Sequence, residues 1–247
     1  MIKIFIYIFI TIINLNINTP AISKEKIYIA VSSNFLFTIN KIKLNFEKKY
    51  KCKLIISSDS TSSLYTKIIN GAPFDIFISA DSKHITLLEK KNITEKSKTY
   101  AYGKIVLWML DVKKKTKLSI LTNKFKNLSV SNPKLSPYGK ASKNSIKNLN
   151  LKSHTNFIYG CNINQTFNFI LSNNSTIGFI ALSQIKHHKT EEKIYWKIQK
   201  YMYKTIEQKM AILKNSKNKK LSENFFKYLN KDKNKQIIIN HGYKIKT

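Results

Sequence analysis

The sequence predicts an α/β protein built of two lobes, and three observations support this fold class. Strand and helix patterns alternate along most of the chain. The alternation starts anew near residue 103, with no long flexible linker before it. Four polar turns follow predicted strands, two in each half of the chain. We therefore expect two mixed, mostly parallel sheets flanked by helices, with a ligand cleft between the lobes.

The first half of the chain carries three predicted strand–helix units. Continuous apolar runs predict strands at residues 27–31, 54–56 and 74–79. Apolar side chains at helical spacing predict helices that contain residues 35–46, 64–69 and 85–88. Strands that alternate with helices in this way form parallel sheets, because each helix carries the chain back to the start of the next strand.

The second half repeats the pattern. Strands are predicted at residues 104–109, 129–130, 157–158 and 178–182, and helices at residues 139–149 and 166–171. Apolar residues near the end of the chain predict two further helices, at residues 225–229 and 236–240. The two halves are similar in size, and the absence of a long flexible linker between them indicates lobes of one protein rather than independent domains.

Composition argues for a globular protein and against a nucleic-acid partner. The chain has 247 residues, of which 43% are hydrophobic, and a formal net charge of +31. All 44 basic residues are lysine. Arginine is the preferred residue for bidentate contacts to phosphate and guanine, so a selected nucleic-acid binder without it would be unusual. We interpret the lysine excess as a compositional bias and expect no nucleic-acid partner.

Residues 1–23 are predicted to be a cleaved signal peptide. A short basic start precedes the apolar run 4–13, and Ala21-Ile22-Ser23 offers small residues for cleavage. The alternative is an uncleaved membrane anchor, but the run is shorter than the about 20 residues that span a bilayer. We expect an exported, monomeric protein of the periplasm. Its two cysteines, Cys52 and Cys161, are interpreted as separate buried thiols.

A run of hydroxyl side chains marks the turn after the second strand. In the segment "KLIISSDSTSSLYTKI", residues 53–68, six serine or threonine residues lie within positions 57–63, where a helix begins. One such residue suffices to cap a helix. Turns at residues 32–34, 136–139 and 160–164 also offer neutral donors beside free N–H groups of a helix start. Together the four turns favour a site that holds one small anion between two lobes.

Several segments resemble the periplasmic molybdate-binding proteins of ABC transporters. They are "IAVSSNF", "GAPFDIFISAD", "YGKIVLW", "NPKLSPYGKA", "IGFIALSQ" and the C-terminal "FFKYLNKDKNKQIIINHGY". The resemblance implies a type II periplasmic binding protein, with a first lobe of residues 24–102 and 214–247 and a second lobe of residues 103–213. It implies capture of molybdate or tungstate, delivery to membrane permease subunits, and no further cofactor.

The same resemblance implies the residues of the site. Matched turn by turn, the oxyanion ligands are Ser33, Asn34, Ser60, Thr61, Tyr138 and the backbone around Asn162 and Ile163. The neighbouring Ser58, Ser62 and Ser63 are interpreted as capping or solvent-exposed residues. Three residues depart from the family pattern, namely Asp59, Cys161 and Ala181. A carboxylate aimed at an anion would repel it, so we expect Asp59 to turn away or to pair with a lysine.

Two other functions remain open at this point. A hydrolase is conceivable because serine, histidine and aspartate are present, but no Gly-x-Ser-x-Gly or His-Glu-x-x-His motif occurs. We expect a protein that is not an enzyme. A carrier of the same fold for another tetrahedral oxyanion, such as sulfate, differs mainly in the radius of its ligand, which a sequence does not resolve.

Overall fold

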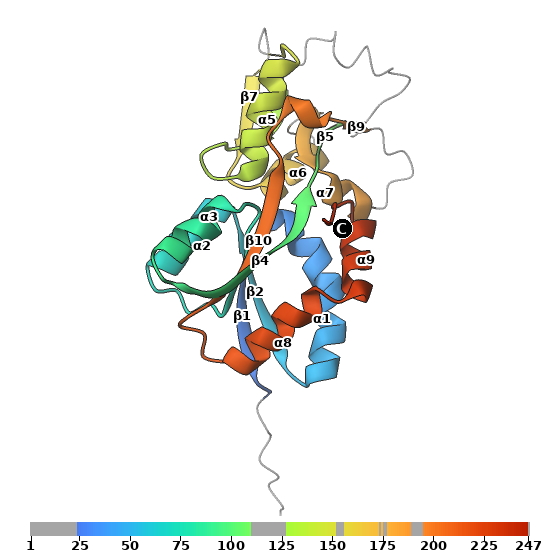
Figure 1. The fold of residues 1–247 in the computed structure, drawn as a ribbon. Helices are drawn as coiled ribbons and strands as arrows, with labels where there is room; N and C mark the ends of the chain where they lie inside the picture. The colour runs from blue at the N-terminus through green and yellow to red at the C-terminus, as the bar shows by residue number, and fades with distance from the viewer. Residues whose placement is uncertain are drawn as a thin grey trace, which may run out of the picture.

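The computed structural model describes residues 24–109, 127–151, 156–172, 174, 177–188 and 195–246, and these residues form two lobes (Figure 1). The predicted signal peptide lies outside the described residues. Each lobe holds one five-stranded sheet. Within the described part of the chain, no helix combines the length and the apolar character needed to cross a membrane.

The sheet of the first lobe has the strand order β2-β1-β3-β10-β4. Strands β1 (Lys26–Ser32), β2 (Lys53–Asp59) and β3 (Ile76–Ile78) are parallel, and β10 (Ile206–Leu213) runs antiparallel to both β3 and β4 (Thr94–Gly103). Apolar β1 and β3 are buried at the centre of this sheet because helices cover both of its faces.

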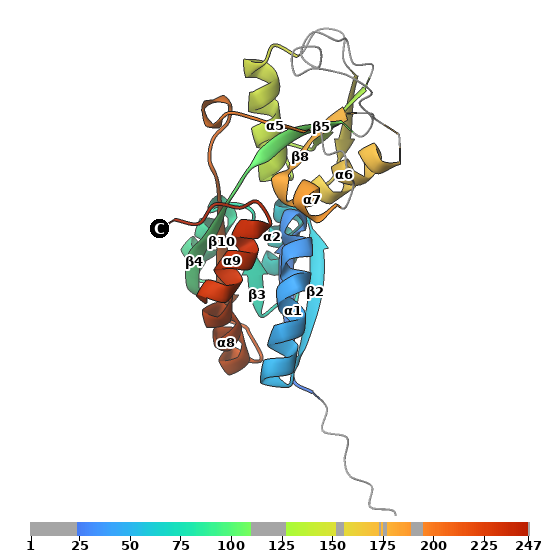
Figure 2. The same ribbon diagram turned by 90° about the vertical axis from the view of Figure 1, so that its right-hand side faces the viewer.

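Helices of the first lobe pack as two separate layers. Helices α1 (Leu36–Tyr50), α8 (Lys219–Leu229) and α9 (Asp232–Asn240) cover one face through a core that includes Phe46 and Phe225. Helices α2 (Thr61–Ile69) and α3 (Lys83–Lys90) cover the other face, around Leu64 and Phe77. Figure 2 shows α1, α8 and α9 together in front of the sheet.

The second lobe has the strand order β7-β6-β8-β5-β9. Its strands are β5 (Ile105–Met109), β6 (Asn127–Ser131), β7 (Asn156–Gly160), β8 (Ile177–Ala181) and β9 (Tyr195–Lys197). Helix α5 (Pro137–Asn148) packs on one face. Helices α6 (Ile163–Leu171) and α7 (Leu182–His187) pack on the other, around Trp108 and Phe167.

The chain passes between the lobes along two neighbouring strands. Strand β4 leads into β5 of the second sheet, and β10 returns beside β4, with Ile206 opposite Gly103. The expected lobe boundary at residue 213 is therefore wrong, because β10 already lies in the first sheet from Ile206 onward. Strand β10 has a mixed polar and apolar sequence, so it lacks the continuous apolar run that predicted the other buried strands.

The start of α5 fits closely against the end of β6. A Cβ atom on Gly139 would clash with the carbonyl oxygen of Ser131 and lie 2.7 Å from the carbonyl carbon of Asn132. Both are backbone atoms, which cannot turn aside as a side chain can. We expect Gly139→Ala to lower the free energy of unfolding by about 1–3 kcal/mol, as for other overpacked sites. Urea unfolding of both proteins measures this, and equal midpoints would contradict it.

Candidate functional site

Four turns from both lobes meet at the carboxyl ends of the parallel strands. The first lobe contributes the 3-10 turn η1 (Ser33–Phe35) and the start of α2. The second lobe contributes the starts of α5 and α6. The lobes touch here, since the Asn34 amide Nδ2 lies 3.4 Å from the Tyr138 hydroxyl and the Ser183 hydroxyl donates to the Asn34 carbonyl at 3.0 Å. The structure therefore brings together the turns that the sequence indicated.

Thr61 is positioned so that its hydroxyl proton is free to donate to a ligand. Its Oγ1 lies 2.9 Å from the Ser32 hydroxyl, and Ser32 also accepts the N–H of Ala80 at 3.0 Å. Ser32 can give its own proton to Thr61, which leaves the Thr61 proton for another partner. Thr61 is also the first residue of α2, where a backbone N–H has no partner within the helix. Ser33, 5% exposed, lies at the neighbouring turn.

Ser60 is the N-cap of helix α2. Its hydroxyl accepts the N–H of Ser63 at 3.2 Å and donates to the Ser63 hydroxyl at 2.7 Å, so it caps α2. Its own N–H donates to Asp59 at 2.7 Å. Both donors of Ser60 are thus used within the first lobe. The role of Ser60 as a ligand stays a prediction, which these hydrogen bonds within the first lobe do not favour.

Asp59 turns away from the site, as expected. Its second carboxylate oxygen forms an ion pair with Lys67 on α2, at 2.9 Å. The carboxylate is thereby neutralised by a lysine of its own lobe and accepts hydrogen bonds only from residues beside it. An anion bound at the start of α2 would meet no repulsion from a free carboxylate at this position.

Tyr138 presents a hydroxyl proton at the junction of the lobes. Its oxygen accepts from Gln208 Nε2 at 2.9 Å and from Asn34 Nδ2 at 3.4 Å, so its own proton remains for a third partner. Burial, with a further contribution from neighbouring Tyr243, raises the pKa of Tyr138 well above its ordinary value. The hydroxyl therefore stays protonated and able to donate.

Asn34 lies at the centre of a buried network. Its Nδ2 also contacts Gln208 Oε1 at 3.0 Å and the Tyr243 hydroxyl at 3.1 Å, while its Oδ1 is buried without a partner among the described residues. The Tyr243 hydroxyl donates to the Asn34 carbonyl at 2.7 Å. The side chain thus joins a residue of β10, a residue near the C-terminus and, through Tyr138, the second lobe.

At the fourth turn, the Asn162 side chain caps helix α6, and the backbone N–H at the start of that helix is available to donate to an anion. Asn162 Oδ1 accepts the N–H groups of Asn164 and Gln165, each at 3.0 Å, and so caps α6. The N–H of Ile163 is the first of that helix and has no partner within it. The Ile163 carbonyl accepts from Gln184 at 3.1 Å, which fixes the turn. This geometry is compatible with the prediction that the backbone around Asn162 and Ile163 donates to the anion.

Sequence reasoning missed three residues of the junction, namely Gln208, Tyr243 and Ser183. Gln208 is fully buried in β10 and bonds to Asn34, Tyr100 and Tyr138. A buried glutamine among the apolar residues of "IEQKMAIL" is a signal that could have marked it. Tyr243 belongs to the quoted C-terminal segment, and Ser183 to "IGFIALSQ", but their partners lie far away in the sequence.

Two residues that depart from the family pattern have no donor side chain in the site. Ala181 ends β8, and its N–H donates to Gln184 at 3.0 Å. Cys161 is exposed and unpaired, so the interpretation of both cysteines as buried is wrong for Cys161, whereas Cys52 is buried. Cys161 is the first residue after β7.

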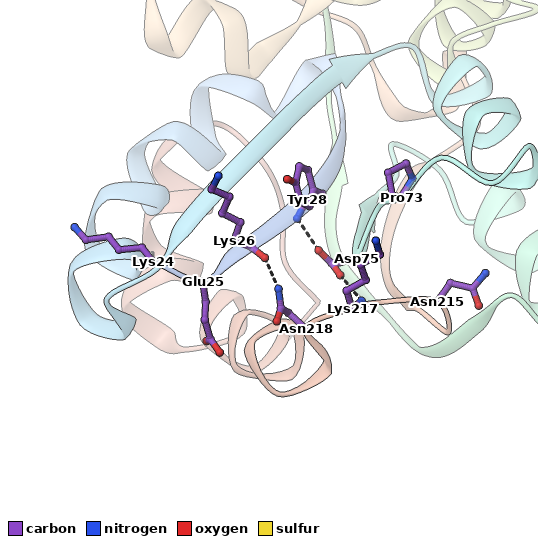
Figure 3. Close-up of a pocket in the computed structure, with 9 residues that line it drawn as sticks. All are labelled: Lys24, Glu25, Lys26, Tyr28, Pro73, Asp75, Asn215, Lys217 and Asn218. Carbon is purple, nitrogen blue, oxygen red and sulfur yellow. Dashed lines mark hydrogen bonds between the residues drawn. The ribbon is translucent and has the colours of Figure 1, made fainter. Parts of the chain in front are cut away.

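A separate pocket of about 420 Å³ lies at the opposite, amino end of β1 (Figure 3). Its buried acid, Asp75, accepts the N–H groups of Tyr28 and Lys217 and the hydroxyl of Ser216. These bonds fix β1 and the segment before α8 to each other. The pocket is otherwise lined mainly by polar and lysine side chains, and the hydrogen bonds of Asp75 serve the fold.

Two mixed α/β lobes, two crossing strands and a donor-lined junction define the class of two-lobed extracellular solute-binding proteins. The sequence pattern of the family described as "Bacterial extracellular solute-binding protein" matches residues 27–244. Within this class the chain belongs to the molybdate-binding protein ModA family. This is a family of binding proteins, so the expectation that the chain is not an enzyme is confirmed.

Relatives match nearly the whole chain. The chain is 34% identical to the molybdate-binding protein ModA of Azotobacter vinelandii over 232 residues, which are 88% of this chain and 89% of that protein. It is 28% identical to ModA of Rhodobacter capsulatus, over 91% of this chain and 90% of that protein. The solved periplasmic molybdate-binding protein of A. vinelandii superposes with a TM-score of 0.83 and 27% identity, covering 90% of this chain and 100% of that one. These matches confirm the predicted fold.

Proposed function

We propose that this protein captures molybdate or tungstate between its lobes and delivers the anion to the permease subunits of an ABC transporter. Membership of the ModA family supports the molybdate assignment. The observation that carries the proposal is the junction of uncharged donors from both lobes, with the hydroxyl protons of Thr61 and Tyr138 left without a required protein partner. The remaining ligands that we propose are Ser33, Asn34 and the backbone at Ile163.

Uncharged donors suit a specific carrier of a dianion. A fixed set of O–H and N–H groups can be satisfied fully by one tetrahedral guest of the right size, so the set discriminates by radius. A lysine is a mobile charge that accepts many anions. Each hydrogen bond to a charged acceptor contributes about 1.5–3 kcal/mol, and helix N-termini add to the affinity. The lysine-rich surface raises the rate of encounter with anions, less so in salt.

Calorimetry with molybdate, tungstate, sulfate and phosphate, on a protein of residues 24–247, tests the assignment. We expect molybdate and tungstate to bind more tightly than the other two anions. Binding needs no metal cofactor in this proposal, so treatment with a chelator should leave the affinity unchanged. Tighter binding of sulfate would assign the cleft to the smaller anion. Tighter binding of phosphate would point to the unpartnered Asn34 Oδ1 as an acceptor for the phosphate proton.

We also propose that the protein works in the periplasm after removal of residues 1–23. An extracellular solute-binding family fits this location. A carrier must reach its membrane partner from the side on which the anion enters, and the apolar run at residues 4–13 is suited to export. The expected partners are therefore permease subunits that accept the anion from the closed carrier.

A further inference from the structure

Ser62 connects the two lobes beside the candidate site. Its backbone N–H donates to the carbonyl of Leu135 at 3.1 Å, and its hydroxyl donates to the carbonyl of Lys134 at 3.3 Å. Both acceptors belong to the turn before α5, in the second lobe. Ser60 is the residue that caps α2, and the hydroxyl of the half-buried Ser62 points across the junction instead.

A histidine–aspartate pair lies behind this serine. His84 Nε2 lies 3.2 Å from the Ser62 hydroxyl, and His84 Nδ1 lies 2.9 and 2.8 Å from the two carboxylate oxygens of Asp81. Burial alone would raise the pKa of Asp81, but the hydrogen bonds and charge of His84 outweigh it and lower the pKa. Asp81 is therefore ionised and accepts a proton from His84 Nδ1.

The number of protons on Ser62 and His84 limits which of these contacts can be hydrogen bonds at the same time. The Ser62 hydroxyl has one proton, and a backbone carbonyl can only accept. When that proton points to Lys134, His84 must donate from Nε2 as well as from Nδ1, which only the protonated imidazole can do. A neutral His84 instead accepts the Ser62 proton and leaves the Lys134 carbonyl without it. The charge of His84 thus sets the direction of the Ser62 proton.

We propose that Ser62, oriented by His84 and Asp81, is a positioning residue that clasps the lobes closed over the bound anion. We name this set, with the backbone of Lys134 and Leu135, the interlobe clasp. The proposal deepens the proposed function and rests on it for the identity of the anion. The clasp acts by slowing the opening of the cleft, so it sets the dissociation rate of the anion, and it holds more firmly when His84 is protonated.

The order Asp81–His84–Ser62 is also that of hydrolase triads. Here the serine hydroxyl donates to a backbone carbonyl of the opposite lobe, so it is not presented to a substrate. The groups that face His84 are Asp81, the ring of Tyr65 from α2 at 5.2 Å, and Ser62, while the side chain of Lys134 across the junction is exposed. Asp81 is the charged group in direct contact with the imidazole.

Release of radioactive molybdate, chased with unlabelled molybdate, tests the clasp. We expect Ser62→Ala to release the anion about three- to tenfold faster, as the loss of one hydrogen bond between uncharged groups implies. Ser62→Thr keeps the hydroxyl and should restore slow release. Ser58→Ala removes an exposed hydroxyl of the same run and should release at the wild-type rate. Equal rates for wild type and Ser62→Ala would overturn the proposal.

The pH dependence separates a clasp from a merely structural contact. Release of molybdate from the wild type should quicken as pH rises, because a neutral His84 accepts the Ser62 proton and the Lys134 carbonyl loses it. This quickening should be smaller in Ser62→Ala and in His84→Gln, because both variants lack the contact between the Ser62 hydroxyl and the imidazole. An unchanged pH profile in both variants would refute the role given to His84.

A measurement on ligand-free protein tests the interlobe clasp independently of the proposed function. Small-angle scattering of ligand-free protein should give a larger mean radius of gyration for Ser62→Ala than for the wild type, because the closed state is less populated. If the wild type retains no radioactive molybdate, the proposed function is wrong, and the scattering comparison still decides the clasp. Equal radii together with equal release rates would leave no role for Ser62 between the lobes.

Discussion

Thr61→Ala is expected to weaken molybdate binding about ten- to a hundredfold, as the loss of one hydrogen bond to a charged acceptor implies. The Thr61 hydroxyl can accept the Ser32 proton, which leaves its own proton for the anion. The residue is 1% exposed, so water cannot replace the lost donor in the closed cleft. The methyl group of threonine contributes packing, which Thr61→Ser separates from the effect of the hydroxyl. Calorimetry with molybdate measures all three proteins.

The neighbouring residues make the Thr61 test specific. Ser58→Ala changes an exposed hydroxyl three positions earlier and should leave the affinity unchanged. Ser60→Ala removes the cap of α2, which should cost about 0.5–2 kcal/mol of stability with a much smaller loss of affinity. An affinity loss for Ser60→Ala as large as that for Thr61→Ala would show that the hydroxyl run does not divide into caps and donors as the geometry indicates.

Asn34→Ala should have an effect of similar size, about ten- to a hundredfold on molybdate affinity. The change removes a proposed ligand and also leaves Gln208 Oε1 without its 3.0 Å donor. It withdraws one of the two donors to Tyr138, whose hydroxyl then loses its fixed orientation toward the anion. Because these groups are fully buried, water does not compensate for the missing amide.

A second buried asparagine provides the control for Asn34. Asn234 is 2% exposed in α9, far from the junction, and donates to the Tyr228 carbonyl at 2.7 Å. Asn234→Ala should lower the unfolding temperature and leave molybdate affinity close to that of the wild type. Calorimetry and thermal unfolding of both variants separate the two effects. An Asn34→Ala protein that binds within twofold of the wild type would exclude Asn34 from the site.

The sequence predicted the buried strands well because their apolar runs are continuous. Strands β1 and β3 were found for that reason. Strand β4, "TEKSKTYAYG", was not found, because it lies at the edge of its sheet and alternates between exposed and buried residues over only part of its length. Strand β10 was missed because a buried glutamine and a lysine interrupt its apolar residues.

In the site, the sequence located the turns but not every role within them. Which of Ser60 and Thr61 caps α2 depends on whether the helix begins one residue earlier or later, and sequence signals do not fix boundaries that finely. The role of Ser62 depends on Lys134 and Leu135, which lie more than seventy positions away along the chain. Contacts of that kind follow from the closed arrangement of the lobes, which local patterns do not encode.

The position of β10 has a consequence for the order of folding. This strand lies between β3 and β4 in the first sheet, although the whole second lobe separates it from them in the sequence. The second lobe is one continuous segment, so it can gather its core from nearby residues. Until residues 206–213 arrive, β3 lacks a partner along one edge and the edge strand β4 has no partner strand in the sheet. Pairing across so long a stretch of chain is slow, because the entropy of closing the loop is lost before any contact is gained. A nascent chain that stops short of β10 therefore has a complete second lobe and an open first one.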